Sequence, residues 1–193
     1  MQGRQNPLTN PVPAMTPFEI LDRPGLLFAL LAAASVLMLG GAFAFQYIGG
    51  LEPCVLCLWQ RYPYGAVIAL GLVGTGLARS PSPPAGVLAA VMGLVALALL
   101  TDAAIAGFHV GVEQKWWQGT AACVGATGAD SIEALRAQLL AQKVVRCDEI
   151  AWQLAGISMA GYNMLAAAGL GLVASLAAGR MARPNGADGG SDG

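Results

Sequence analysis

Residues 54–61 read Cys-Val-Leu-Cys-Leu-Trp-Gln-Arg, and they lie between two long runs of uncharged, mostly apolar residues. The run before them covers residues 24–51, and the run after them covers residues 62–78. Two thiols and a nearby cation therefore lie at the ends of two segments that are suited to lipid. This placement predicts a dithiol site at the edge of a membrane.

The composition indicates the class of protein. Hydrophobic residues make up 56% of the chain and charged residues only 11%, whereas charged residues approach about 25% in soluble domains. We therefore expect an integral membrane protein. The net charge of -1 and the lack of a Lys and Arg cluster exclude a basic surface for nucleic acid.

The gaps between charged residues predict an all-α membrane protein built as a four-helix transmembrane bundle over residues 24–178. A crossing needs about 20 apolar residues, and lipid leaves an open backbone no hydrogen-bond partners outside a helix. We place the spans near residues 26–48, 58–78, 86–108 and 154–178. They imply a short outer loop at 49–57, a long outer loop at 109–153, and disordered tails at 1–23 and 179–193.

Arginines predict the orientation of this bundle. Four crossings bring both tails and the turn at 79–85 to one face, which carries Arg4, Arg23, Arg79, Arg180 and Arg183. By the positive-inside rule this face, with both termini, is cytoplasmic. The cysteines then face an outer compartment that permits disulfides.

The chemistry of residues 54–61 starts from the predicted helix beginning after Pro53. Cys54 and Cys57 fall in its first turn, where free amides and the helix dipole favour a thiolate. Arg61 lies four residues after Cys57, so we expect it to lower the pKa of Cys57 further. The alternative is that Arg61 only extends to the lipid headgroups.

A CxxC pair alone is weak evidence for one chemistry. The spacing of Cys123 and Cys147 is far longer than the about 2 to 4 residues of a zinc site, and no His adjoins either pair, so we predict no metal. Leu58 after Cys57 excludes attachment of a c-type haem. Two structural disulfides that only brace the outer loops stay open. A transporter is disfavoured because Asp102 is the only charge within a span.

The pattern resembles the DsbB family of disulfide bond formation proteins. The residues that carry the resemblance are the Cys-Val-Leu-Cys motif, Gln60-Arg61 two residues later, and Cys123 and Cys147 as the second pair. It covers about residues 24–178. The CxxC precedes the loop cysteines, unlike the order in bacterial homologues of vitamin K epoxide reductase.

The resemblance implies a quinone-dependent protein thiol:disulfide oxidoreductase of the bacterial inner membrane. Such an enzyme reoxidises a periplasmic DsbA-like oxidase of thioredoxin fold and passes electrons to the membrane quinone pool, which sustains disulfide bond formation. Ubiquinone is the favoured cofactor and menaquinone the alternative. By position, Cys123 receives the partner's attack, Cys147 pairs transiently with Cys54, and Cys57 contacts quinone with support from Arg61.

Two further polar residues are candidates. His109, the only histidine, matches a quinone-proximal histidine of the family and would donate a hydrogen bond or a proton to quinone. Without the resemblance, it reads as an inert interfacial anchor. Asp102, on about the same helix face, is predicted to orient His109 or to relay protons.

Two features depart from the family or match it only in role. Gln60 stands where the family often has an acidic residue, which leaves more of the Arg61 charge available. In the long loop, Ile132, Leu135, Leu139 and Val144 predict an amphipathic helix at 131–145 that lies on the membrane surface or packs on the protein.

Overall fold

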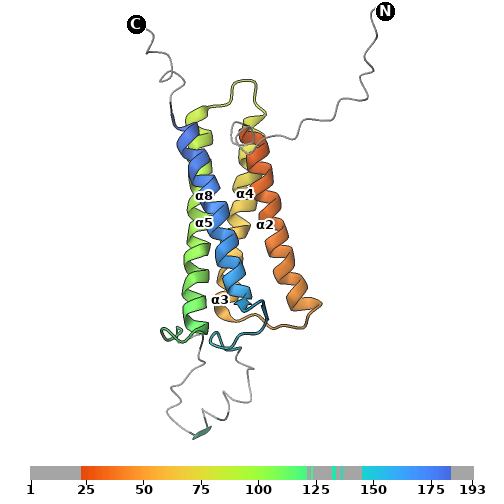
Figure 1. The fold of residues 1–193 in the computed structure, drawn as a ribbon. Coiled ribbons are helices and arrows are strands. Elements are labelled where there is room, and N and C mark those ends of the chain that lie inside the picture. Colours follow the sequence, from red (N-terminus) through yellow and green to blue (C-terminus); the bar gives the residue numbers. More distant parts are fainter. Residues whose placement is uncertain (1–22, 121–122, 124–131, 134–135, 137–144, 184–193) are drawn as a thin grey trace, which may run out of the picture.

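The structure is a computed structural model that describes residues 23–120, 123, 132–133, 136 and 145–183. Its helices are α2 (Pro24–Tyr47), α3 (Val55–Trp59), α4 (Arg61–Ala78), α5 (Ala85–Glu113) and α8 (Met159–Met181). Figure 1 shows α2, α4, α5 and α8 standing side by side, with the short α3 near one end. Most of the predicted helix at 131–145 and the tail at 1–22 lie outside the described residues.

The prediction of a helical membrane bundle is confirmed in its main feature. Among the described residues, α2, α5 and α8 are long and apolar enough to cross a membrane. Helix α4 packs within the same bundle but is not one of these three. The fourth crossing therefore stays a prediction.

Helix α5 extends further than the sequence suggested. It ends at Glu113, whereas the expected span ended at residue 108. With 29 residues at about 1.5 Å each it is roughly 44 Å long, which exceeds the roughly 30 Å hydrocarbon core. His109 and Glu113 therefore lie on a rigid helix and not in a loop.

A small β-hairpin occupies the residues where the last helix was expected to begin. Strands β1 (Gln153–Leu154) and β2 (Ile157–Ser158) pair antiparallel, and the two residues between them have positive φ angles, 49° at Ala155 and 79° at Gly156. Such angles define the tight turn that suits a two-residue hairpin. Helix α8 consequently begins at Met159 and not near residue 154. It continues to Met181, so residues 179–181 are helical and not part of a disordered tail.

The expected second helix is divided at Gln60. Helix α3 ends at Trp59 and α4 begins at Arg61. Pro63 lacks the N–H group that would bond the carbonyl of Trp59 in a continuous helix. The residues from Cys57 to Arg61 therefore do not follow one uninterrupted helix.

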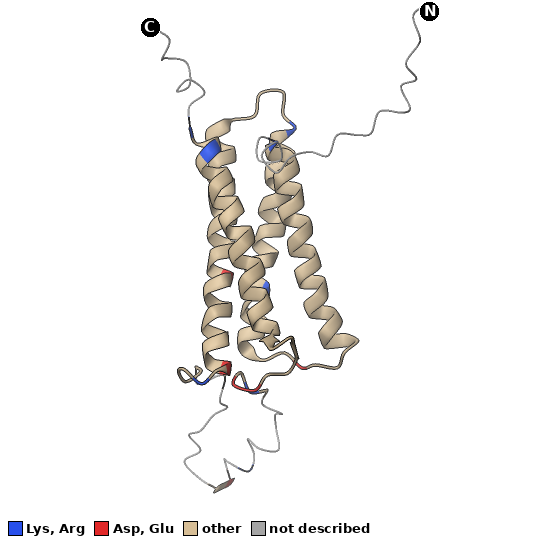
Figure 2. Ribbon diagram, viewed as in Figure 1, with Lys and Arg blue, Asp and Glu red and all other residues tan. Residues whose placement is uncertain are grey.

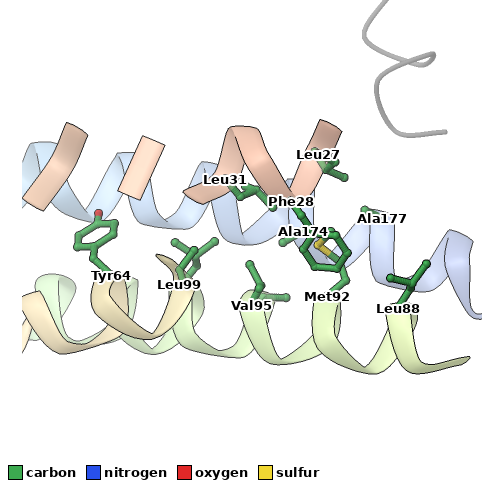
Figure 3. Close-up of a cluster of buried hydrophobic side chains, with 12 residues drawn as sticks. Leu27, Phe28, Leu31, Tyr64, Leu88, Met92, Val95, Leu99, Ala174 and Ala177 are labelled. Carbon is green, nitrogen blue, oxygen red and sulfur yellow. The ribbon is translucent and has the colours of Figure 1, made fainter. Parts of the chain in front are cut away.

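The core lies between the helices, and apolar side chains also cover the outside. Figure 3 shows Phe28 and Met92 at its centre, with Val95 and Leu99 along α5, and all four are fully buried. On the outer faces, Leu37, Leu72 and Leu97 are 76%, 66% and 62% exposed. Leucines in such number on the outside of a bundle are suited to lipid and not to water.

Charged residues gather at the ends of the bundle. Figure 2 shows Lys and Arg at the end where α2 begins and where α4 and α8 finish, and acidic residues mainly at the opposite end. Arg23, Arg79, Arg180 and Arg183 belong to the first group by their place in the chain. This arrangement is the one that the positive-inside argument assumed, and the orientation in the membrane stays a prediction.

The fully buried residues of helix α2 all lie in its first half. Its buried residues run from Leu27 to Ser35. Gly71 of α4 permits the close approach, because a Cβ atom there would lie 2.8 Å from the Cβ of Ala32 and 3.0 Å from the carbonyl oxygen of Phe28. The second half of α2 makes polar and ring contacts at the other end of the bundle.

Replacing Gly71 by Ala tests this contact. The added methyl group meets backbone atoms that cannot rotate away, so we expect a loss of about 1–3 kcal/mol of stability. Gly76→Ala on the same helix is the matched control, since nothing lies within 4 Å of its Cβ position. The control should be neutral or gain up to about 1 kcal/mol from helix propensity. Thermal unfolding in detergent micelles measures both, and equal melting temperatures would contradict the close contact.

Candidate functional site

The CxxC pair lies at the start of α3 as a dithiol. Cys54 is the N-cap residue, and its Sγ accepts a hydrogen bond from the N–H of Cys57 at 3.3 Å. The two sulfur atoms are 2.8 Å apart, and both cysteines are free. Cys54 is buried, while Cys57 is half-buried. The helix start expected from Pro53 is thus confirmed, with Cys54 just before the first turn.

The second cysteine pair lies in the same buried cluster as Cys54. Cys123 and Cys147 form a disulfide. They share one buried cluster with Cys54, Leu56 and Val112. All four predicted cysteines therefore come together at one end of the bundle, although the cluster does not by itself assign the order of their reactions.

His109 reaches this cluster from the last turns of α5. Its Nε2 lies 3.6 Å from the Sγ of Cys54 and 3.8 Å from an oxygen of Glu113. Its Nδ1 lies 3.1 Å from the amide nitrogen of Gln60. The side chain is buried. The ring therefore connects the dithiol to polar groups of the bundle interior.

Asp102 belongs to the same network but does not touch His109. Its Oδ2 accepts a hydrogen bond from the side-chain N–H of Asn163 at 3.0 Å, and Asn163 also donates to Gln60 at 2.7 Å. Asn163 and Glu113 were not among the predicted site residues. Two signals pointed to them: Asn163 is a polar residue inside an apolar run, and Glu113 lies one helical turn after His109.

Arg61 turns into the bundle. Its Nη1 donates to Gln46 at 2.7 Å, and its guanidinium carbon lies 4.8 Å from the centre of the Phe43 ring. Its Nε is buried without a hydrogen-bond partner among the described residues. A buried donor without a hydrogen-bond partner is costly, more so when it belongs to a charged group. Arg61 therefore keeps one donor available for a ligand.

These side chains line a cavity of about 720 Å³. Cys54, Cys57, Arg61, His109 and Glu113 form its polar part. Much of its wall is apolar and comes from α2 and the start of α8, including Leu37, Met38, Ala42, Phe45 and Ala160. A mostly apolar pocket with a few converging polar groups is typical of a small-molecule site.

The structure corrects the expectation about which cysteine is acidic. The hydrogen bond from Cys57 contributes most to lowering the pKa of Cys54 to about 4; burial opposes it, and a hydrogen bond from His109 adds to it. The same bond to Cys54, followed by burial, raises the pKa of Cys57. The predicted low pKa at Cys57 is therefore wrong for this dithiol form. The cause is local, because Cys54 receives the donors while Arg61 bonds Gln46.

The structure removes one reason for predicting no metal site. The sequence placed no histidine next to either cysteine pair, but His109 joins Cys54 and Cys57 in space. One donor atom from each lies within 4.8 Å of the other two. Two thiolates and an imidazole are suitable zinc ligands, so the geometry alone permits a metal there.

The dithiol, the adjacent disulfide and the apolar pocket define a membrane protein of thiol and disulfide chemistry. The sequence model of the family described as Disulfide bond formation protein DsbB matches residues 24–177. The chain therefore belongs to the DsbB family of membrane helical bundles.

Individual relatives agree with this assignment. Disulfide bond formation protein B 2 of Pseudomonas savastanoi pv. phaseolicola is 33% identical over 161 residues, which cover 79% of this chain and 87% of that protein. Disulfide bond formation protein B of Verminephrobacter eiseniae is 35% identical over 163 residues, with coverage of 79% and 85%. No solved structure matches the chain.

Alkylation tests the assignment of the acidic thiol. In a variant with Ser at positions 123 and 147, iodoacetamide should modify Cys54 faster than Cys57, and the rate should fall only as the pH falls towards the Cys54 pKa of about 4. His109→Ala should raise that midpoint by roughly 1 to 2 units, because a hydrogen bond to a charged group contributes about 1.5–3 kcal/mol. Peptide mass spectrometry across a pH series measures both. Faster modification of Cys57 would contradict the assignment.

Proposed function

We propose that this chain reoxidises a DsbA-like thioredoxin-fold oxidase in the periplasm and passes the two electrons to quinone. One observation carries the proposal. Cys54 shares one buried cluster with the Cys123–Cys147 disulfide and, with Cys57, also lines an apolar pocket. Electrons that reach the loop pair therefore have a short route to the pocket.

The exchange steps involve only sulfur atoms. A thiolate of the reduced partner attacks Cys123, which breaks the bond to Cys147, and the partner's second thiolate then releases Cys123 as the partner's own disulfide forms. Cys147 next attacks Cys54 in the oxidised CxxC pair and displaces Cys57. Attack by Cys123 on Cys147 restores the loop disulfide and leaves Cys54 and Cys57 reduced. The described form has this last arrangement of one disulfide and one dithiol.

The pocket fits quinone as the acceptor. When bound there, quinone supplies a carrier for two electrons and two protons. The apolar wall suits its ring and tail, and Arg61 offers the unsatisfied Nε. Cys57 and Arg61 line the same pocket, and the Nε2 of His109 faces the Sγ of Cys54, which also lines it. We favour ubiquinone, with menaquinone as the alternative.

The location in the cell follows from the charge pattern. With the arginine-rich end in the cytoplasm, the cysteines face the periplasm from the inner membrane. Reagents that do not cross the membrane should then reach the cysteine end in intact spheroplasts.

Trapping tests the partner-facing thiol. In Cys147→Ser, the free Cys123 should attack the disulfide of an oxidised DsbA-like protein and form a mixed disulfide, because Cys147 is no longer present to displace the partner. Quenching with acid keeps the partner's second thiol from reversing this bond. Cys123→Ser is the matched control and should give no such species on non-reducing gels. Equal trapping in both variants would contradict the roles, and trapping in neither would favour disulfides that only brace the loops.

Quinone reduction tests Arg61. With pre-reduced protein and a soluble ubiquinone analogue, Arg61→Ala should slow quinol formation by roughly 10- to 100-fold, the equivalent of about 1.5–3 kcal/mol from a charged hydrogen bond. Arg61→Lys keeps the charge but not the planar fork, so its loss should be smaller. Thiol exchange at Cys123 should persist in both. Arg79→Ala, at the other end of the bundle, is the control, and unchanged kinetics in Arg61→Ala would remove Arg61 from the site.

A further inference from the structure

A chain of hydrogen bonds crosses the interior from Asp102 to the dithiol. Asn163 of α8 donates to Asp102 at 3.0 Å and to Gln60 at 2.7 Å. The amide nitrogen of Gln60 lies 3.1 Å from the Nδ1 of His109, whose Nε2 lies 3.6 Å from Cys54. All the side chains that form this series of hydrogen bonds are buried. Water is therefore not needed to explain any of its contacts.

The two ends of Asn163 fix how its amide is turned. A carboxylate only accepts hydrogen bonds, so Asn163 must present its NH2 group to Asp102. Its oxygen then faces the hydroxyl of Tyr64, which donates to it at 2.6 Å. The reversed amide would place the Asn163 oxygen against the oxygen of Asp102, where the two would repel each other.

The orientation of the Asn163 amide determines that of the Gln60 amide, which in turn determines the protonation of the His109 ring. Because Asn163 donates to the Gln60 oxygen, the NH2 group of Gln60 faces His109. An amide NH2 only donates, so the Nδ1 of His109 must carry a lone pair and no proton. The ring proton then lies on Nε2, which faces the sulfur of Cys54.

We propose that Asp102, Asn163 and Gln60 are positioning residues that hold His109 with its proton on Nε2, directed at Cys54. The consequence for turnover rests on the proposed function, but the position of the proton does not. Asp102 determines which group donates in every hydrogen bond of this series. All the bonds could run in the opposite direction only if residue 102 were a donor, and a carboxylate is not. This is why an acidic side chain lies inside the bundle.

The same arrangement limits where protons travel. Gln60 and Asn163 keep their amide hydrogens, so no proton passes from Asp102 through them to His109. Exchange at the ring takes place at Nε2, and Glu113 is the carboxylate that lies beside it, at 3.8 Å. Glu113 also bonds the hydroxyl of Ser158 at the end of the bundle. Asp102 therefore orients the site, and Glu113 is the group placed to exchange its proton.

The single histidine makes the proposal directly measurable. The full chain is labelled with [15N]histidine in detergent micelles, without quinone or partner, at mildly alkaline pH where carboxyl groups are ionised. We expect one pyridine-type signal from Nδ1 and one protonated, pyrrole-type signal from Nε2. A proton on Nδ1 in the unmodified chain would overturn the proposal.

Two substitutions that keep the size and shape of the side chain test whether Gln60 and Asp102 determine the position of the His109 proton. Gln60→Glu places an acceptor at Nδ1, so the Nδ1 signal should move to the protonated position. Asp102→Asn allows residue 102 to donate, so the chain can reverse and both tautomers should be populated. Ser35→Ala is the control, because Ser35 is buried in α2 with an unpartnered hydroxyl and lies outside this chain, and its spectrum should match the unmodified one.

The outcomes separate this proposal from the proposed function. If Gln60→Glu leaves the Nδ1 signal in place, or if Asp102→Asn keeps a single tautomer, the positioning role is wrong even when the protein reduces quinone. If both variants shift the signals as expected but the unmodified protein reduces no quinone, only the proposed function fails. Should Gln60→Glu not fold, Asp102→Asn carries the test alone.

Discussion

Polar side chains inside an apolar bundle have no water to bond, so they must satisfy one another. In this protein that requirement joins four elements. Asp102 and His109 come from α5, Asn163 and its partner Tyr64 from α8 and α4, and Gln60 from the break between α3 and α4. These bonds hold the dithiol at a fixed place on a bundle whose other contacts are mainly apolar. The interior of the bundle therefore helps to position the sulfur of Cys54, in addition to its cluster with the loop cysteines.

The backbone supports the same end of the bundle in a second way. Helix α5 is long enough to bring His109 to Cys54, the N-cap of α3. Cys54 is the N-cap of α3, and the Gln60 side chain between α3 and α4 faces His109. Rigid helices thus carry most of the site, which favours precise placement of its groups.

Much of this arrangement could be predicted from the sequence, and the reasons for the remainder are physical. Uncharged runs predicted the long helices, because lipid tolerates few charges, and the CxxC pair with the family resemblance predicted the cysteines, His109 and Arg61 as candidates. Hydropathy does not report which helix faces meet, so Asn163 and Glu113 were missed. The acidic thiol was misassigned because the argument treated Cys57 and Arg61 as neighbours on one helix. In the structure the partner of Cys57 is Cys54 and the partner of Arg61 is Gln46 of α2, and hydropathy shows neither contact.

The second half of α2 forms part of the pocket wall, which has a consequence for ligand entry. Residues of this half and of the start of α8 both line the pocket, and both helices are long and apolar enough to cross a membrane. A molecule dissolved in lipid would then enter the pocket between these two helices, without passing through water. Its chain would stay in the acyl layer, where each buried CH2 group already contributes about 0.8 kcal/mol. The protein then has to recognise only the head of such a molecule, and the bilayer supplies the rest of the affinity.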